Sequence, residues 1–121
     1  MMVNTAERRK APRINADFPV KYRILKAQNN DSADWNTYRE IKADNISEFG
    51  IALLAKEPLA EGDIIQANFY IEGREIDAFC TVVWSDYVKE KEGFETGLEF
   101  DFIGQYDAIY LVQYIKKRLE E

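Results

Sequence analysis

A short basic stretch near the start of the chain holds the residues that are best suited to chemistry. Four cations lie within six residues of a chain whose net charge is −6, namely Arg8, Arg9, Lys10 and Arg13. The guanidinium group of arginine is planar and carries a positive charge at any physiological pH. Pro12 disfavours helical geometry in the residue before it, so the stretch is predicted to be an extended or turning arm. Such an arm suits a flat, anionic ligand, and a solvated tail is the alternative.

A second polar cluster lies between two expected strands and consists of Asn45, Ser47 and Gly50. The amide of Asn45 offers both a donor and an acceptor, and Ser47 offers a hydroxyl. Gly50 can adopt a positive φ or let a ligand approach the backbone closely. The same residue types are also standard in turns. On its own, the cluster therefore leaves open a structural turn and a polar ligand site.

The composition excludes several classes of function. The chain has 121 residues, no histidine and one cysteine, Cys80. Ser-His-Asp and Cys-His pairs are therefore impossible, and zinc would lack its usual ligands. We expect a protein that is not an enzyme and that holds no metal or other cofactor. The single cysteine, the lack of a signal-peptide pattern and the lack of an apolar run of ~18–20 residues favour a cytoplasmic location without membrane insertion.

The charges are unevenly distributed along the chain. Residues 7–26 carry seven Lys/Arg against two acids, a balance of +5 that leaves −11 for residues 27–121. Binding of long nucleic acid depends on neutralising many phosphates, which an acidic body opposes. A local basic arm on an acidic body fits a small anion better.

Periodicity predicts six short strands followed by one helix. Turn signals separate the strands, and Glu72-Gly73 is one of them. Strands are expected at residues 18–27, 38–43, 51–54, 63–71, 75–86 and 94–102, and an amphipathic helix at 104–120. Strands at this spacing favour a small barrel or sandwich in one domain. We expect residues 1–17 to form a flexible basic arm and residues 18–121 to form the folded domain.

Several apolar side chains are expected in the core. Cys80, Phe79 and Trp84 belong to a strand that is apolar on both faces, as in a central strand. In the next strand, one face is predicted to carry Phe94, Thr96, Leu98, Phe100 and Phe102. The helix carries an apolar stripe (Ile109, Val112, Ile115 or Lys116, and Leu119) and a tyrosine stripe (Tyr106, Tyr110 and Tyr114), and we expect the tyrosines to pack against the strands. Trp35 lies in a polar loop, where an ordinary edge contact is expected.

The order and spacing of the short motifs resemble the PilZ domain, a family that binds the bacterial second messenger cyclic di-GMP. The resemblance covers nearly the whole chain: Glu-Arg-Arg-Lys-Ala-Pro-Arg, Phe-Pro-Val-Lys-Tyr, Asp-Asn-Ile-Ser-Glu-Phe-Gly-Ile-Ala-Leu, Val-Val-Trp and Gly-Leu-Glu-Phe. It implies an all-β fold with one C-terminal helix, namely a six-stranded antiparallel β-barrel of the PilZ-like split type.

The resemblance also implies roles for individual residues. Arg9 and Arg13 correspond to the paired arginines of the family, which contact guanine and phosphate. Asn45 and Ser47 would contact the guanine edge and the phosphate or ribose, and Gly50 would permit the turn. Asn in place of Asp at position 45 implies a somewhat lower affinity. Arg8 is of the type that helps some members to hold a stacked dimer of the ligand.

The function implied is that of a single-domain receptor or adaptor in motility or biofilm regulation. Binding of cyclic di-GMP would order the arm, which would then present a changed surface to an unidentified downstream protein. The chain itself would be a monomer or a homodimer. The alternative is a PilZ-like interaction module that leaves the nucleotide site unused and works through the tyrosine-lined helix or the strand around Ile41 and Ala43. A small nucleic-acid-binding barrel is disfavoured by the acidic body.

Overall fold

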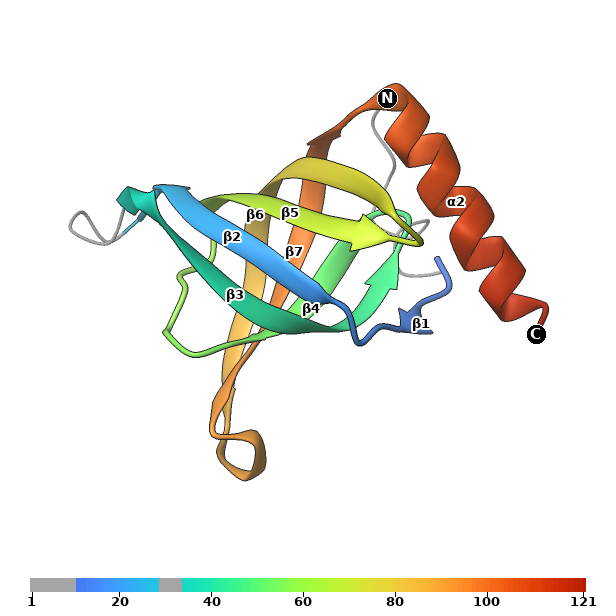
Figure 1. Ribbon diagram of the computed structural model, residues 1–121. Helices are drawn as coiled ribbons and strands as arrows, with labels where there is room; N and C mark the ends of the chain where they lie inside the picture. Colours follow the sequence, from blue (N-terminus) through green and yellow to red (C-terminus); the bar gives the residue numbers. More distant parts are fainter. Residues whose placement is uncertain (1–10, 29–33) are drawn as a thin grey trace.

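Six long antiparallel strands close into a barrel, and one helix packs beside it (Figure 1). The computed structural model describes residues 11–28 and 34–121. The predicted fold class is confirmed. The elements are β1 (Ile14–Asn15), β2 (Pro19–Lys26), β3 (Asp34–Ser47), β4 (Gly50–Ala55), β5 (Ile64–Ile71), β6 (Arg74–Val88), the 3-10 turn η1 (Lys89–Lys91), β7 (Gly93–Ile103) and α2 (Gln105–Leu119).

The barrel is closed because its first and last strands pair with each other. The strand order is β3-β2-β5-β6-β7-β4, and β4 pairs in turn with β3. Closure leaves fewer unpaired edges than an open sheet would. The two-residue strand β1 pairs with the far end of β3, where Ile14 faces Ile46 and Asn15 faces Asn45. Residues 14 and 15 of the basic arm are therefore attached to the strand that carries Asn45.

Strict alternation in β2 and β5 fills the interior of the barrel. Apolar side chains at every second position point inward, as expected where one face of a sheet is buried. The buried residues of these two strands are those that the alternation predicts: Val20, Tyr22, Ile24, Ile65, Ala67, Phe69 and Ile71. The turn at Glu72-Gly73 is also confirmed, because both residues have positive φ angles of 49° and 85°.

Cys80 is fully buried in β6, as predicted. Burial raises the pKa of its thiol, and the charge of Asp101 adds to this effect. The folded state therefore favours the neutral thiol, and stability should fall once the unfolded thiol ionises, above about pH 8.5, by up to about 1.4 kcal/mol per pH unit. We expect the native protein not to react with a thiol reagent at pH 8. We also expect urea unfolding of Cys80→Ala to depend less on pH between about 8.5 and 10.

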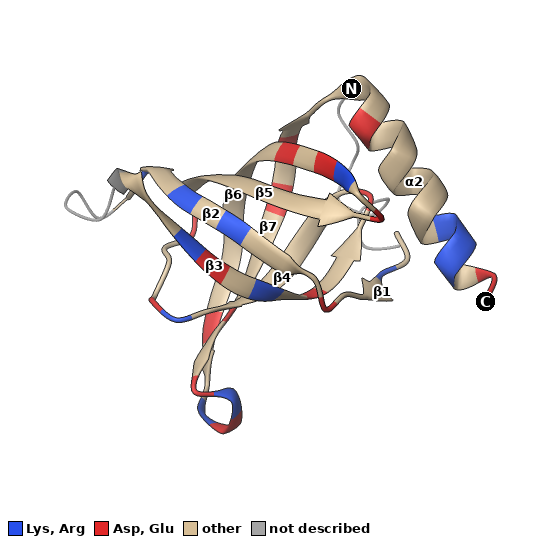
Figure 2. Ribbon diagram, viewed as in Figure 1, with Lys and Arg blue, Asp and Glu red and all other residues tan. Residues whose placement is uncertain are grey.

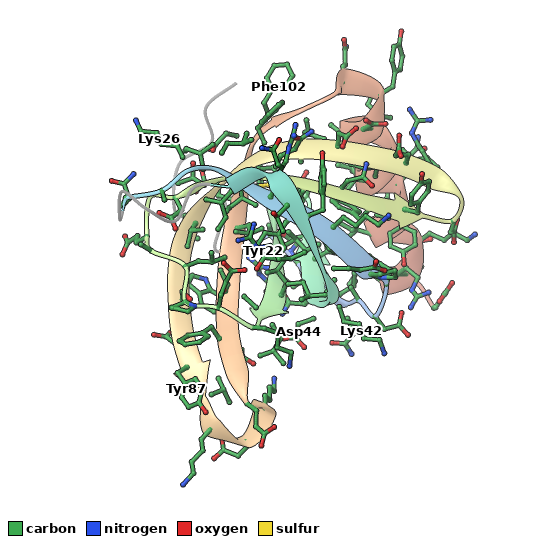
Figure 3. All side chains as sticks on the ribbon, turned by 60° about the vertical axis from the view of Figure 1, so that its left-hand side comes forward. Tyr22, Lys26, Lys42, Asp44, Tyr87 and Phe102 are labelled. Carbon is green, nitrogen blue, oxygen red and sulfur yellow. The ribbon has the colours of Figure 1, made fainter. Side chains whose placement is uncertain are left out.

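The prediction that places Phe79 in the core is wrong, and so is the prediction that Phe102 shares a face with the buried Thr96 and Leu98. Phe79 is 42% exposed and Phe102 is 69% exposed, and Figure 3 shows Phe102 projecting from the outside of the barrel. Phe79 pairs with Phe102 while the next residue, Cys80, pairs with Phe100, so Asp101 is an extra residue in β7. This bulge breaks the alternation in β7 and turns Phe102 to the outside. Phe79 lies between the buried residues Ala78 and Cys80, so regular alternation in β6 places it on the outer face.

Trp84 is also misplaced by the sequence prediction, again because of a bulge. Val82 pairs with Leu98 and Trp84 pairs with Gly97, so Val83 is an extra residue in β6. Strict alternation from Cys80 and Val82 would bury Trp84. The bulge instead leaves its side chain 39% exposed on the surface of the barrel.

The helix α2 packs against the barrel through most of the face that was expected to do so. Leu111 and Ile115 enter the core, and Tyr110 and Tyr114 pack against it, which confirms two of the three tyrosines. The prediction for Tyr106 is wrong, because this side chain is 76% exposed. The hydroxyl of Tyr110 donates a hydrogen bond to the carbonyl of Ile71 (3.1 Å), which joins the helix to the end of β5.

Candidate functional site

A cleft of about 700 Å³ opens on the outside of the barrel where several elements meet. Its size falls in the range typical of small-molecule sites. The chain before β1, the β3–β4 turn, β4, β6 and β7 all contribute to its walls, which include Arg13, Ser47, Phe49, Gly50, Trp84 and Gly97. Two of the clusters singled out in the sequence thus share one cleft.

Arg13 joins these two clusters directly. One terminal nitrogen (Nη1) of its guanidinium donates a hydrogen bond of 2.7 Å to the Oδ1 of Asn45. The pairing of β1 with β3 makes this contact possible, because it holds the residues after Arg13 beside Asn45. Partial desolvation lowers the pKa of Arg13 from its usual value, but a guanidinium remains charged at neutral pH. Asn45 therefore orients a cation at the rim of the cleft.

Ser47 lies at the base of the cleft and is almost fully buried. Its Oγ accepts a hydrogen bond from the backbone N–H of Phe49 (3.2 Å). Ser47 pairs with Gly50 across the tight turn between β3 and β4. The hydroxyl therefore stabilises the turn through its oxygen, and its proton can still be donated to a ligand.

Gly50 is required by the neighbouring strand. A Cβ atom at this position would overlap with the carbonyl oxygen of Leu98 in β7. The backbone of Phe100 also donates to the carbonyl of Phe49 (2.8 Å), which draws the turn toward β7. The close approach of the two backbones, and not a positive φ, explains the glycine.

Trp84 is one of the residues of the cleft that the sequence analysis did not assign to a site. A Cβ atom on Gly97 would overlap with the indole of Trp84, so the ring lies directly against the backbone of β7. The glycine inside a strand was the available signal, because such a glycine often marks the close approach of another group. The predicted contributions of Arg8 and Arg9, and the side chain of Trp35, lie outside what the structure describes.

The described part of the chain holds no cluster of three or more His, Cys, Asp or Glu side chains that could hold a metal ion. Within residues 11–28 and 34–121, no helix is both long and apolar enough to cross a membrane.

The fold and the site together define a small β-barrel with an arginine at the rim of a surface cleft. The sequence profile of the PilZ domain matches residues 7–117. The chain belongs to the PilZ domain family, a family of cyclic di-GMP receptors.

Two solved structures share the fold. The Bacillus subtilis inhibitor of motility (MotI/DgrA) superposes with a TM-score of 0.73 and 22% identity over 94% of this chain. This chain spans 52% of that protein, or about half its length. The PilZ domain of CeSA from a cellulose-synthesising bacterium has a TM-score of 0.60 and 17% identity, and the match covers 92% of this chain and 100% of that domain. No curated protein sequence matches the chain.

Proposed function

We propose that this protein is a non-enzymatic receptor that binds cyclic di-GMP in the cleft between the arm, the β3–β4 turn and β6–β7. The observation that carries the proposal is the hydrogen bond from Arg13 to Asn45, which brings the arginine cluster and the Asn-x-Ser-x-x-Gly cluster to one cleft. Membership of the PilZ family supports the choice of ligand.

The chemistry of the cleft suits a guanine dinucleotide. The guanidinium of Arg13 matches the O6/N7 edge of guanine or a phosphate, and its planar face can stack on a base. The exposed indole of Trp84 offers a second stacking surface at the same cleft. Glu61 lines the cleft as well, and its carboxylate can accept from the N–H groups of guanine. Arg9 is proposed as the second arginine of the pair, and Arg8 as an aid to binding a stacked ligand dimer.

Signal output is proposed to pass through the arm. A ligand held by Arg9 and Arg13 fixes the arm against the barrel, and the ordered arm presents a new surface to a downstream protein. We place this receptor in the cytoplasm. One structural neighbour is named an inhibitor of motility, so motility is the output to test first.

Isothermal titration of the purified protein with cyclic di-GMP tests the proposal. We expect saturable binding in the micromolar range or tighter, and no binding of cyclic di-AMP, which presents a different edge to Arg13. Absence of binding at tens of micromolar would overturn the nucleotide function. The PilZ-like interaction module that does not use the site would then be favoured.

Replacement of Trp84 tests the stacking surface. Trp84→Ala should weaken the binding of cyclic di-GMP about tenfold or more, because one base–aromatic stack contributes about 1–3 kcal/mol. Tyr87→Ala is the matched control, since this ring is 60% exposed and projects from the β6–β7 hairpin (Figure 3). The control should bind like the wild type. Equal affinities for all three proteins in the titration would exclude stacking on Trp84.

A further inference from the structure

One side of α2 carries apolar side chains that the barrel does not cover. Ile109, Val112, Lys116 and Leu119 follow one another at intervals of three or four residues, so they share one side of the helix. We call these four residues the α2 stripe. Its apolar members are 49%, 41% and 49% exposed, in chain order. The core is contacted instead by Leu111 and Ile115.

An apolar groove runs along the edge of the α2 stripe. Its volume is about 210 Å³, and it is lined by Val112, Ile115, Lys116 and Leu119 of α2, by Pro12, and by Glu48 of the β3–β4 turn. Lys116 and Glu48 are both exposed to solvent. The groove therefore has an apolar floor between one cation and one anion. Two copies of this surface can be complementary, because the cation of each copy can lie beside the anion of the other.

We propose that the α2 stripe is the interface of a homodimer in which the two helices pack antiparallel. The 3-4-3 spacing of the stripe is that of a coiled-coil seam, which favours another helix as the occupant. A two-fold axis near Tyr114 places Ile109 against Leu119 of the second copy, and Val112 against the aliphatic stem of Lys116 of the second copy. This proposal is independent of the nucleotide function.

The helix dipoles and the charges of Lys116 and Glu48 favour that arrangement. The first turn of α2 contains Asp107 and the last turn contains Lys116, Lys117 and Arg118, as the red and blue segments of Figure 2 show. Asp107 pairs with Arg74 of β6 (2.9 Å) and lies on the other side of the helix, so it takes no part in the contact. Antiparallel packing opposes the two helix dipoles. The ammonium of Lys116 also comes to the groove that holds Glu48 of the second copy. A second copy therefore meets both the apolar and the charged requirements of this surface.

The size of the contact sets the strength of the dimer. A helix of 15 residues is only about 22 Å long, so the buried area falls at the low end of the range for stable interfaces, roughly 1,200 Å². We therefore expect a reversible equilibrium between monomer and dimer that depends on protein concentration.

Sedimentation velocity of the full chain, without nucleotide, from low micromolar to near-millimolar concentration tests the proposal. The wild type should shift from monomer to dimer, and Val112→Glu should weaken the dimer about tenfold or more. Phe102→Glu is the control, because this side chain is 69% exposed on the barrel, and it should dimerise like the wild type. Thermal melts check that each variant is folded, and Leu119→Glu serves as a second variant. Any one of three results would overturn the proposed dimer interface. The wild type could stay monomeric, Val112→Glu could dimerise normally, or Phe102→Glu could lose the dimer as well.

Cross-linking tests the antiparallel orientation. In the proposed register, a variant with Ile109→Cys and Leu119→Cys should form a disulfide-linked dimer under mild oxidation. Ile109→Cys alone should not, because ten residues of helix, or about 15 Å, separate the two thiols. Efficient linkage of the single variant would indicate parallel helices and overturn the proposed packing.

Discussion

The double variant Arg9→Ala/Arg13→Ala is expected to bind cyclic di-GMP about a thousandfold more weakly than the wild type. Each bidentate contact of an arginine with guanine contributes roughly 1–3 kcal/mol, and a stacking contact contributes about as much. Loss of both arginines should therefore cost on the order of 4 kcal/mol. Isothermal titration measures the loss directly. The affinity of the double variant should also depend less on salt, because two cations that face the anionic ligand are gone.

Arg23→Ala is the matched control for this experiment. Arg23 is another arginine of the basic N-terminal segment, but its Nε donates to the side chain of Gln66 (2.6 Å) on the wall formed by β2 and β5. Its replacement should leave the affinity unchanged. Asn45→Ala should weaken binding less than Arg13→Ala, and the combined variant should be no weaker than Arg13→Ala alone, because Asn45 acts mainly by orienting Arg13. Wild-type affinity in the Arg9→Ala/Arg13→Ala protein would refute the assignment of the site.

Gly50→Ala is expected to destabilise the protein by about 3 kcal/mol or more, the upper end of the range for overpacking. The added methyl group would overlap with the backbone oxygen of Leu98. Neither strand can move away without breaking the pairing of Gly50 with Glu99. For a domain of 121 residues, the melting temperature should fall by about 10 °C or more. Urea unfolding and thermal melts followed by circular dichroism measure the effect.

Gly104→Ala is the control, because it replaces a glycine by alanine at a position where no neighbouring strand lies close to the backbone. Gly104 precedes α2 with a φ of −55°, and the nearest atom to an added Cβ belongs to the movable carboxylate of Asp107 (3.2 Å). This substitution should cost about 1 kcal/mol or less. Equal effects of the two substitutions would mean that the approach of β7 does not explain Gly50. Any loss of cyclic di-GMP binding in Gly50→Ala is to be compared with the folded fraction, because the glycine shapes the turn that holds Ser47.

The sequence predicts the barrel well where each strand follows strict alternation. In β2 and β5, every second side chain is apolar from Val20 to Ile24 and from Ile65 to Ile71, and all of these side chains are buried. The two motifs could also be recognised as a pair, because arginines and an Asn-x-Ser-x-x-Gly turn have limited chemical uses when they occur in this order. The hydrogen bond between Arg13 and Asn45 is consistent with the pairing.

The hydrophobic periodicity of the sequence does not predict the bulges or the close contacts between backbones. The extra residues Val83 and Asp101 each change the face on which later side chains lie, and their own types carry no sign of this. Trp84 was expected in the core and Phe102 on the same face as Phe100, and both expectations were wrong. The orientation of α2 also depends on tertiary contacts, because its apolar residues cover more than one side and only packing decides which side meets the core.

The closure of the barrel has a consequence for the lifetime of the protein. Neighbouring strands in the sequence form two halves, β2–β3–β4 and β5–β6–β7, which meet along the seams β2–β5 and β4–β7. The cleft lies across the second seam, since Ser47 belongs to one half and Trp84 and Gly97 belong to the other. In the proposed function, a dinucleotide bound there would hold the halves together and stabilise the folded state. Proteolysis in the cell would then slow as the messenger rises, and the amount of receptor would itself follow the signal.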